Sequence, residues 1–394
     1  MPTTRNRLTI AAVLSVFAGI AACSKNANDA ASNSNPNTVD PVAAVLNLPA
    51  TPDNYSNISM PGYLMTPNVL GQRNTPANNL ITDNGATLGR VLFYDKNLSV
   101  NNTVSCASCH KQVNAFADVA VKSTGFNGGL TNRNSMSLID AIYYPNGRFF
   151  WDQRAATLED QVVTPIQDLV EMGMTLPGLV SKLRGLAYYP VLFKKAFGDT
   201  AINSTRIAAA LAQFVRSIVS YRSKYDFGRS SFPDGPPPPP DTPFPNFTAQ
   251  ENRGKELFFA PNLGGCAGCH GSETFTAPQE KNNGLDAATV DRGFGAVVNN
   301  TNLDATFKVT TLRNVELTAP YMHDGRFTTL EQVIEHYSSG VQNHPNLSQQ
   351  LKLPNGNPRN LNLSAQDKAA LVAFLKTLTD NTVATESKYS NPFK

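Results

Sequence analysis

The sequence is poor in several residue types, and each shortage narrows the range of possible functions. Its 394 residues include five cysteines, five histidines and one tryptophan. The 33 basic and 30 acidic residues leave a formal net charge of +3, and no stripe of Lys and Arg stands out. Because nucleic-acid binding depends on a concentrated positive field, this balance predicts no nucleic-acid partner. Beyond the N-terminal segment, no apolar run is long enough to span a bilayer.

The N-terminal segment has the pattern of an export signal. Arg5 and Arg7 precede the apolar run 8–22, which is too short to cross a bilayer and ends in small residues. The stretch Ile-Ala-Ala-Cys that follows resembles a bacterial lipobox, in which Cys23 becomes the lipidated first residue of the mature chain. We therefore expect a signal peptide at 1–22 and a periplasmic lipoprotein anchored to a membrane through Cys23. An ordinary signal peptide cleaved nearby is the alternative.

The remaining four cysteines occur in two pentapeptides, CASCH at 106–110 and CAGCH at 266–270. Exported proteins also use cysteines in disulfides or zinc sites, but neither use requires a histidine directly after each pair. In C-x-x-C-H, two thiols add to the vinyl groups of a haem and the histidine binds its iron. The motif therefore predicts two covalently bound c-type haems. The expected attachment sites are Cys106, Cys109, Cys266 and Cys269, and the expected iron ligands are His110 and His270.

The surroundings of the two pentapeptides also repeat. A Gly-basic-x-Leu-Phe-aromatic pattern precedes each pentapeptide, and Arg-Asn, Gly-Arg-Phe and Thr-Leu-Glu follow each in the same order. Helical patterns are frequent, as at 204–223, whereas strand signals are sparse. We therefore predict a mainly α fold of two cytochrome c-like haem domains that are related by internal duplication and have long loops.

Composition sets the expected domain boundaries. Residues 23–60 contain little to bury and indicate a flexible tether behind the lipidated cysteine. The segment 232–247, FPDGPPPPPDTPFPNF, cannot continue a helix and indicates an extended linker or surface loop. We therefore expect an N-terminal haem domain at 61–231 and a C-terminal haem domain at 248–394. The second opens on a capping box that starts at Thr248.

Histidine is too scarce to complete both iron sites. No histidine lies between His110 and His270, so the first haem has no local histidine as sixth ligand, and an open site is expected. The methionines of this half, Met136, Met172 and Met174, are the alternative ligands. An open iron favours catalysis, whereas a methionine ligand favours electron transfer.

Three segments carry a family resemblance. The run SCASCH, the run RNSMSLIDAIYYPNGRFFWDQRAATLEDQVVTPIQDLVEM and the run TLRNVELTAPYMHDGRFTTLEQVIEHY resemble the bacterial dihaem cytochrome c peroxidases and the MauG branch of that family. The likeness extends over about residues 85–380.

The resemblance implies that the first haem is the peroxidatic one. It implies Glu171 as the distal acid/base, since cleavage of a peroxide needs a group that takes a proton from one oxygen and returns it to the other. It further implies Gln161 as a hydrogen-bonding partner of peroxide, Pro165 over the distal face and Trp151 as an electron relay between the haems. Without the resemblance, Glu171 reads as a solvated carboxylate and Trp151 as a core residue.

At the second haem, the resemblance implies a departure from the ordinary peroxidases. Those have a Met in the helix after the T-A-P-Y segment, whereas the matching residue here is Tyr337, as in the MauG branch. A tyrosinate ligand stabilises the oxidised metal and favours high-valent chemistry. His336 and Met322 are the alternative ligands, and His323 is interpreted as a hydrogen-bonding residue near the site.

The resemblance also implies a calcium ion between the haems. Its expected ligands are the side chain of Asn134 and the backbone carbonyls of Thr318 and Pro320. Oxygen donors of this kind suit Ca²⁺.

We therefore expect a dihaem peroxidase that reduces hydrogen peroxide at the His110 haem without prior reductive activation. A small donor protein, either a cytochrome c or a cupredoxin, would supply electrons through the His270 haem and Trp151. The first alternative is a MauG-like oxidase that uses peroxide equivalents to modify a partner protein. The second is a non-catalytic electron carrier in which Met172 or Met174 closes the first iron.

Overall fold

The structure, a computed structural model, describes residues 40–394. The predicted signal peptide, the predicted lipid site Cys23 and the first part of the predicted tether lie outside these residues. Within the described part, isolated β-bridges occur but no strand does, which confirms the prediction of a mainly helical fold. Its α-helices are α1 (Pro41–Val45), α2 (Pro67–Leu70), α3 (Asp83–Tyr94), α4 (Cys106–Cys109), α5 (Leu158–Gln167), α6 (Leu176–Arg184), α7 (Tyr188–Phe197), α8 (Ser204–Ser217), α9 (Lys224–Arg229), α10 (Ala249–Phe259), α11 (Ala267–His270), α12 (Phe294–Val298), α13 (Leu330–Glu335), α14 (Ala365–Lys376) and α15 (Asn381–Thr385).

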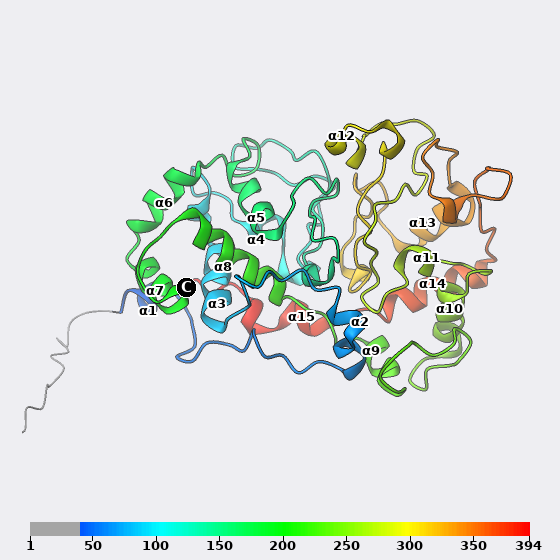
Figure 1. Ribbon diagram of the computed structural model, residues 1–394, viewed down its shortest axis with the longest axis horizontal. Coiled ribbons are helices and arrows are strands. Elements are labelled where there is room, and N and C mark those ends of the chain that lie inside the picture. The colour runs from blue at the N-terminus through cyan, green and yellow to red at the C-terminus, as the bar shows by residue number, and fades with distance from the viewer. Residues whose placement is uncertain (1–39) are drawn as a thin grey trace, which may run out of the picture. The chain divides into compact units, whose positions relative to one another are not determined.

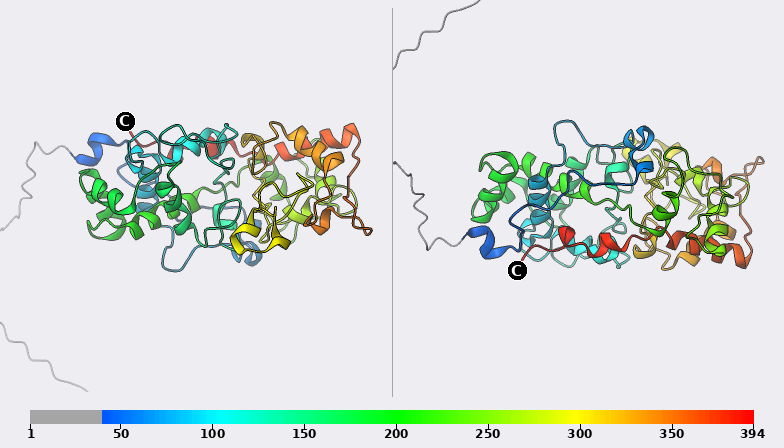
Figure 2. Two further views of the ribbon diagram at one scale, coloured as in Figure 1. Left: turned by 90° about the horizontal axis from the view of Figure 1, so that it is seen from above. Right: turned by 90° about the horizontal axis from the view of Figure 1, so that it is seen from below.

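Two helix pairs form the framework of the described part. Helix α3 packs against α8, and α10 packs against α14. Figures 1 and 2 show one pair in each half of residues 40–394. Both crossings need a glycine: a Cβ on Gly89 would lie 2.0 Å from the backbone oxygen of Ala210, and a Cβ on Gly254 would lie 1.9 Å from that of Ala370. These are the two glycines of the repeated Gly-basic-x-Leu-Phe-aromatic pattern, so the sequence repeat is also a structural repeat.

Local sequence determines where the framework helices begin. At each N-terminus a polar side chain accepts a hydrogen bond from a backbone N–H of the first turn, which otherwise has no partner. These capping residues are Thr82 for α3, Asn203 for α8, Thr248 for α10 and Ser364 for α14. The helix predicted over 204–223 begins at Ser204 but ends at Ser217, because the backbone after it bonds to other segments.

Each helix pair has its own hydrophobic core. The first core joins side chains of α3, α5, α6, α7 and α8. The second joins side chains of α10, α13 and α14, together with Phe244 and Phe247 of the proline-rich segment. That segment is a surface loop held to the body of the protein, because Nζ of Lys255 donates to the backbone oxygen of Pro240 at 2.6 Å.

Both ends of the described part pack on the first core. Tyr55 is buried, and its hydroxyl donates to the backbone oxygen of Lys388 at 2.5 Å. Val383 of α15 and Tyr389 belong to the first core, and Figure 1 shows α15 to the right of α3. The predicted tether, 23–60, therefore includes residues at its C-terminal end that belong to the folded part. The last residues of the proposed C-terminal domain, 248–394, also pack against the first half.

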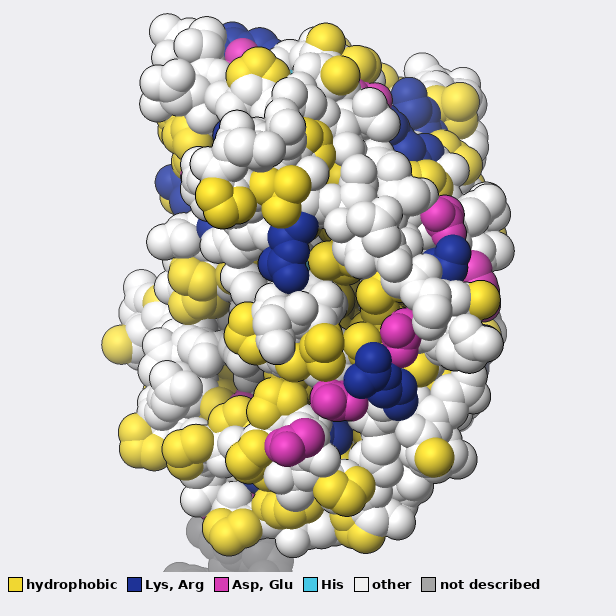
Figure 3. Space-filling view, turned by 90° about the vertical axis from the view of Figure 1, so that its right-hand side faces the viewer, with side chains coloured by type: hydrophobic (Ala, Val, Ile, Leu, Met, Phe, Trp, Pro, Cys, Tyr) yellow, Lys and Arg dark blue, Asp and Glu magenta, His cyan; other side chains and the backbone are white. Residues whose placement is uncertain are grey.

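Charged side chains of both signs lie interspersed with apolar ones around a hollow on the end face of the second half (Figure 3). In the part of the chain that the structure describes, no helix has the length and apolar character needed to cross a membrane.

Candidate active site

The first C-x-x-C-H pentapeptide forms one helical turn. Helix α4 contains Cys106 and Cys109, both as free thiols, and His110 follows at its C-terminus. The His110 ring bonds through Nδ1 to the backbone oxygen of Phe116 at 2.9 Å. Because a carbonyl can only accept, Nδ1 carries the proton and Nε2 is left with a free lone pair. Burial lowers the pKa of the His110 imidazole, which keeps the ring neutral and suited to bind a metal.

The second pentapeptide repeats this arrangement. Cys266 and Cys269 are free thiols, and His270 ends helix α11. The His270 ring bonds through Nδ1 to the backbone oxygen of Phe275 at 2.8 Å, so its Nε2 is also free. Burial lowers the pKa of this imidazole too. Each pentapeptide therefore offers two thiols and one oriented ring nitrogen.

Each pentapeptide lines a large cavity. The N-terminal cavity has a volume of about 600 Å³ and contains Cys109 and His110. The C-terminal cavity has a volume of about 250 Å³ and contains Cys266, Cys269 and His270. Thiols, oriented histidine and cavity together fit one covalently attached haem in each half.

The N-terminal cavity brings together the residues expected around a peroxidatic haem. Trp151, Gln161, Pro165 and Glu171 all line it with His110. Gln161 and Pro165 lie one helical turn apart on α5, whose first turn is capped by Thr157. Glu171 lies in the turn that follows α5, where its backbone N–H donates to the carboxylate of Asp168 at 3.1 Å.

The pKa of the Glu171 carboxyl lies near neutral pH. Burial, followed by the neighbouring Asp168 carboxylate, raises the pKa of Glu171 from 4.5 to about 7, and the Arg154 guanidinium acts in the opposite direction. A carboxyl with a pKa near the working pH is suited to take up a proton and return it.

Two of the three methionines considered as alternative ligands lie away from the cavities. Met172 and Met174 are buried in the first hydrophobic core, and neither lines a haem cavity. Met136 lines both cavities.

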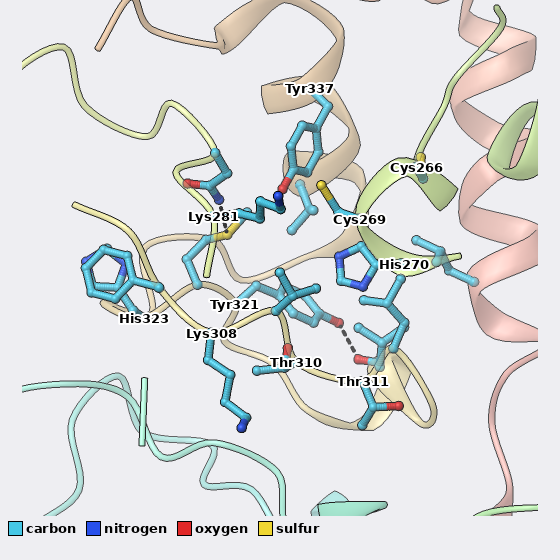
Figure 4. Close-up of a pocket in the computed structure, with 18 of the residues that line it drawn as sticks. Cys266, Cys269, His270, Lys281, Lys308, Thr310, Thr311, Tyr321, His323 and Tyr337 are labelled. Atoms are coloured by element: carbon cyan, nitrogen blue, oxygen red, sulfur yellow. Dashed lines mark hydrogen bonds between the residues drawn. The ribbon is translucent and has the colours of Figure 1, made fainter. Parts of the chain in front are cut away.

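Tyr337 and His270 point into the C-terminal cavity from different segments (Figure 4). Tyr337 lies in a π-helical turn, His336–Gly340, that continues α13. Burial raises the pKa of Tyr337 to about 12, while a hydrogen bond with Asn283 acts in the opposite direction. A metal that binds the phenol oxygen would displace its proton.

The alternative ligands of the second iron are engaged in other contacts. Nε2 of His336 donates to the backbone oxygen of Asn283 at 3.0 Å, and His336 does not line the cavity. Met322 does line it, and its sulfur accepts from Nδ2 of Asn283 at 3.3 Å. The His323 ring stacks on Phe307 with 3.8 Å between the centroids.

The residues expected to hold calcium border one cavity. Asn134, Thr318 and Pro320 all line the C-terminal cavity. Nδ2 of Asn134 donates to the backbone oxygen of Ala120 at 3.1 Å, which leaves its side-chain oxygen for another partner. These oxygen donors suit Ca²⁺, and the calcium site remains a prediction.

A shared wall separates the two cavities. Trp151 and Tyr144 line both of them. The indole Nε1–H of Trp151 donates to the backbone oxygen of Asn134 at 2.9 Å, and its own backbone oxygen accepts from the N–H of Lys308 at 2.8 Å. Trp151 is therefore fixed from both halves.

Comparison with known proteins agrees with these two sites. The model of the di-haem cytochrome c peroxidase family matches residues 83–230, and that of cytochrome c matches residues 251–379. The methylamine utilization protein MauG of Methylophilus methylotrophus is 31% identical over 303 residues, which cover 77% of this chain and 84% of MauG. The cytochrome c551 peroxidase of Nitrosomonas europaea is 30% identical over 298 residues, covering 75% of this chain and 79% of the peroxidase.

The chain belongs to the di-haem cytochrome c peroxidase family. A crystal structure of a MauG-like protein associated with microbial copper homeostasis has 31% identity and a TM-score of 0.69, with 81% of this chain and 96% of that chain covered. Membership confirms the predicted fold class and implies two haems. The relatives of the chain include a cytochrome c551 peroxidase and MauG, which supports a peroxidase type of oxidoreductase activity and is also consistent with a MauG-like one.

Several residues of the two sites are not among those predicted from the sequence. Arg154 and Asp168 act on the Glu171 carboxyl, and Asn283 contacts both Tyr337 and Met322. Lys308 lines the C-terminal cavity. Proximity to FFWDQR and to the P-I-x-x-x-x-E-M run could have pointed to Arg154 and Asp168, whereas Asn283 and Lys308 lie in segments without a recognisable pattern.

Proposed function

We propose that the protein is a dihaem peroxidase that reduces hydrogen peroxide at the His110 site, with electrons that arrive through the His270 site and Trp151. The observation that carries this proposal is the N-terminal cavity, which places a carboxyl of pKa about 7, that of Glu171, in one space with the free Nε2 of His110. The cavity also holds Gln161 and Pro165, which do not close a metal site as a histidine or methionine would, and Met136 is the methionine that borders it.

The residues of the N-terminal cavity have distinct roles in this proposal. A haem bound through Cys106, Cys109 and His110 supplies iron redox chemistry when present. The Glu171 carboxylate takes a proton from one peroxide oxygen and returns it to the other, so that two electrons and two further protons turn one peroxide into two waters. The Gln161 side chain orients peroxide by hydrogen bonding, and Pro165 adds a rigid apolar wall.

This function is tested with the holoprotein and a reduced donor protein, either a cytochrome c or a cupredoxin. We expect two donor equivalents to be oxidised for each peroxide consumed. We also expect one high-spin iron in the oxidised protein, which cyanide converts to low spin. Two low-spin irons that are indifferent to cyanide and peroxide would overturn the proposal and support the electron carrier. The variants Met172→Leu and Met174→Leu are matched controls, since both residues lie in the core, and neither should change the spin states.

A specific observation favours a MauG-like oxidase as second candidate. Tyr337 lines the C-terminal cavity at the position of the MauG-branch tyrosine, and the chain is 31% identical to MauG. A tyrosinate would stabilise the oxidised state of the second site and disfavour electron acceptance from a donor protein. For this function, donor proteins should not accelerate decay of the peroxide-oxidised protein, whereas a protein substrate should acquire a new covalent modification under the same conditions.

We further propose export and lipidation at Cys23, and calcium binding by Asn134, Thr318 and Pro320. The lipobox resemblance supports the first, and the position of the three oxygen donors at one cavity supports the second. The intact mass of the mature protein would show whether Cys23 is its N-terminal, acylated residue.

A further inference from the structure

Lys308 is a buried lysine in the wall between the two cavities. The residue is 5% exposed, and its Nζ donates to the backbone oxygen of Arg148. The same Nζ lies 3.5 Å from the centroid of the Tyr144 ring and 4.9 Å from that of Phe149. Figure 4 shows the Lys308 side chain extending away from Tyr337 and His270. The amine therefore lies against the aromatic rings of the wall and not against the residues expected to bind the second iron.

In residues 40–394, the Lys308 amine has no carboxylate partner. Burial lowers the pKa of Lys308 well below its usual value, and no acidic side chain opposes this effect. Its charged form therefore depends on the Arg148 carbonyl and on the two ring faces, since aromatic faces attract cations. A charge without a counter-ion in a buried place acts strongly on its neighbours, because little water screens it.

Two oxidisable side chains, Tyr144 and Trp151, border both cavities, and Lys308 contacts each of them in a different way. The Nζ of Lys308 lies directly over the Tyr144 ring. Lys308 contacts Trp151 only through the backbone, where its N–H donates to the Trp151 oxygen at 2.8 Å. A positive charge over a ring opposes removal of an electron from that ring. Tyr144 should therefore be the harder of the two to oxidise.

Proton transfer adds to this difference. An oxidised tyrosine must lose its phenolic proton, which needs an acceptor. The Tyr144 hydroxyl instead accepts a bond from the N–H of Thr311 at 3.4 Å, and burial raises its pKa. An oxidised tryptophan can keep its proton, and Nε1–H of Trp151 stays bonded to the oxygen of Asn134 at 2.9 Å.

We propose that Lys308 is a positioning residue for electron transfer: the ammonium that it holds over Tyr144 prevents oxidation of that ring, so that electrons cross the wall through Trp151. In each crossing, Trp151 gives one electron to the oxidised N-terminal site and regains one from the C-terminal site. No proton moves and no bond changes. The inference rests on the proposed function, because it presupposes that electrons cross between the two sites.

The test compares protein radicals in holoprotein variants that are frozen after reaction with one equivalent of hydrogen peroxide. Lys308→Met and Lys308→Gln remove the charge, whereas Lys308→Arg retains it. Lys255→Met is the matched control: Lys255 is also buried, donates to a backbone carbonyl and lies 5.0 Å from the Phe244 centroid, but it lines neither cavity. Electron paramagnetic resonance with ring-deuterated tyrosine identifies tyrosyl radicals.

We expect the tyrosyl yield to rise at least about tenfold in the neutral variants at Lys308, and to vanish when Tyr144→Phe is added. Lys308→Arg and Lys255→Met should match the unaltered protein. A purely structural role would change haem content or rate but not the identity of the radical. Neutral variants that react with peroxide yet form no additional tyrosyl radical would overturn the proposal, as would a tyrosyl signal that survives Tyr144→Phe.

Failure of the proposed function gives a different result. If the unaltered protein does not react with peroxide, that function is wrong, and a photogenerated one-electron oxidant then decides the role of Lys308 in the same variants. A rise of the Tyr144-dependent radical on loss of the charge would still support the proposal, and an unchanged yield would overturn it.

Discussion

The Glu171 carboxyl should determine how the reaction with peroxide depends on pH. As a base, it acts only when it is ionised, and burial with the help of Asp168 raises its pKa to about 7. The carboxyl is therefore protonated and inactive as a base below that pH, and ionised above it. Its ionised fraction rises from roughly one tenth at pH 6 to roughly nine tenths at pH 8, so the rate of the first step with peroxide should increase about tenfold over this range.

Replacement of the carboxyl separates this effect from other titrations. Glu171→Gln retains the shape of the side chain but cannot accept the proton. We expect the rate with peroxide to fall by about 10²–10⁴-fold, the usual range for loss of a general acid/base, and to lose its rise between pH 6 and pH 8. The measurement is stopped-flow absorbance of the holoprotein mixed with excess peroxide across this pH range.

Two neighbours of Glu171 provide opposite controls. Asp168 raises the pKa of Glu171 and Arg154 lowers it. Asp168→Asn should therefore move the midpoint of the pH profile to lower pH, while its side-chain oxygen can still accept from the N–H of Glu171. Arg154→Met should move the midpoint to higher pH. A Glu171→Gln variant that reacts as fast as the unaltered protein, or midpoints that do not move in these opposite directions, would refute the reasoning.

Further predictions concern the second iron, calcium and the helix crossings. Tyr337→Phe should alter the low-spin signal in electron paramagnetic resonance and raise the reduction potential of the second site, because an anionic oxygen stabilises oxidised iron; an unchanged spectrum would exclude Tyr337 as ligand. Chelation should remove one calcium ion per chain and slow electron transfer between the sites, and Asn134→Ala should prevent calcium from rebinding, as metal analysis would show. Gly89→Ala should lower the free energy of unfolding in urea by about 1–3 kcal/mol, because its Cβ would collide with the backbone of Ala210. Gly185→Ala, whose Cβ would lie 3.4 Å from its nearest neighbour, should stay within about 0.5 kcal/mol, and equal losses in both variants would contradict the role of the close crossing.

The features that sequence predicts well are those encoded over short distances. The thiols and histidine of each pentapeptide occupy one helical turn, and the caps of α10 and α14 are four-residue patterns that begin at Thr248 and Ser364. The repeated glycine pattern is equally local, and the structure shows that its glycine makes a close helix crossing possible in each half.

The features that sequence does not predict depend on contacts between distant segments. Tyr55 lies in a polar stretch typical of a tether, yet its hydroxyl reaches Lys388, 333 positions away. A lysine such as Lys308 is expected at the surface, and its burial becomes evident only from its contact with Arg148, 160 positions away. The same limit applies to the pKa of Glu171, which depends on burial that no local pattern encodes.

The duplication also explains how one half can stay open while the other half can be closed. Thr157 caps α5 and Thr329 caps α13, and the residues one, four and eight positions after each cap line the cavity of their own half. In the first half these are Leu158, Gln161 and Pro165, and in the second they are Leu330, Val333 and Tyr337. The first two positions share one helical face, and both halves place the eighth position in the wall of their cavity. A proline there offers no atom that can bind iron and leaves room for peroxide, whereas a tyrosine offers a phenol oxygen. In the proposed function, this single position of the repeat therefore separates the site that reacts with peroxide from the site that stores its oxidising equivalents.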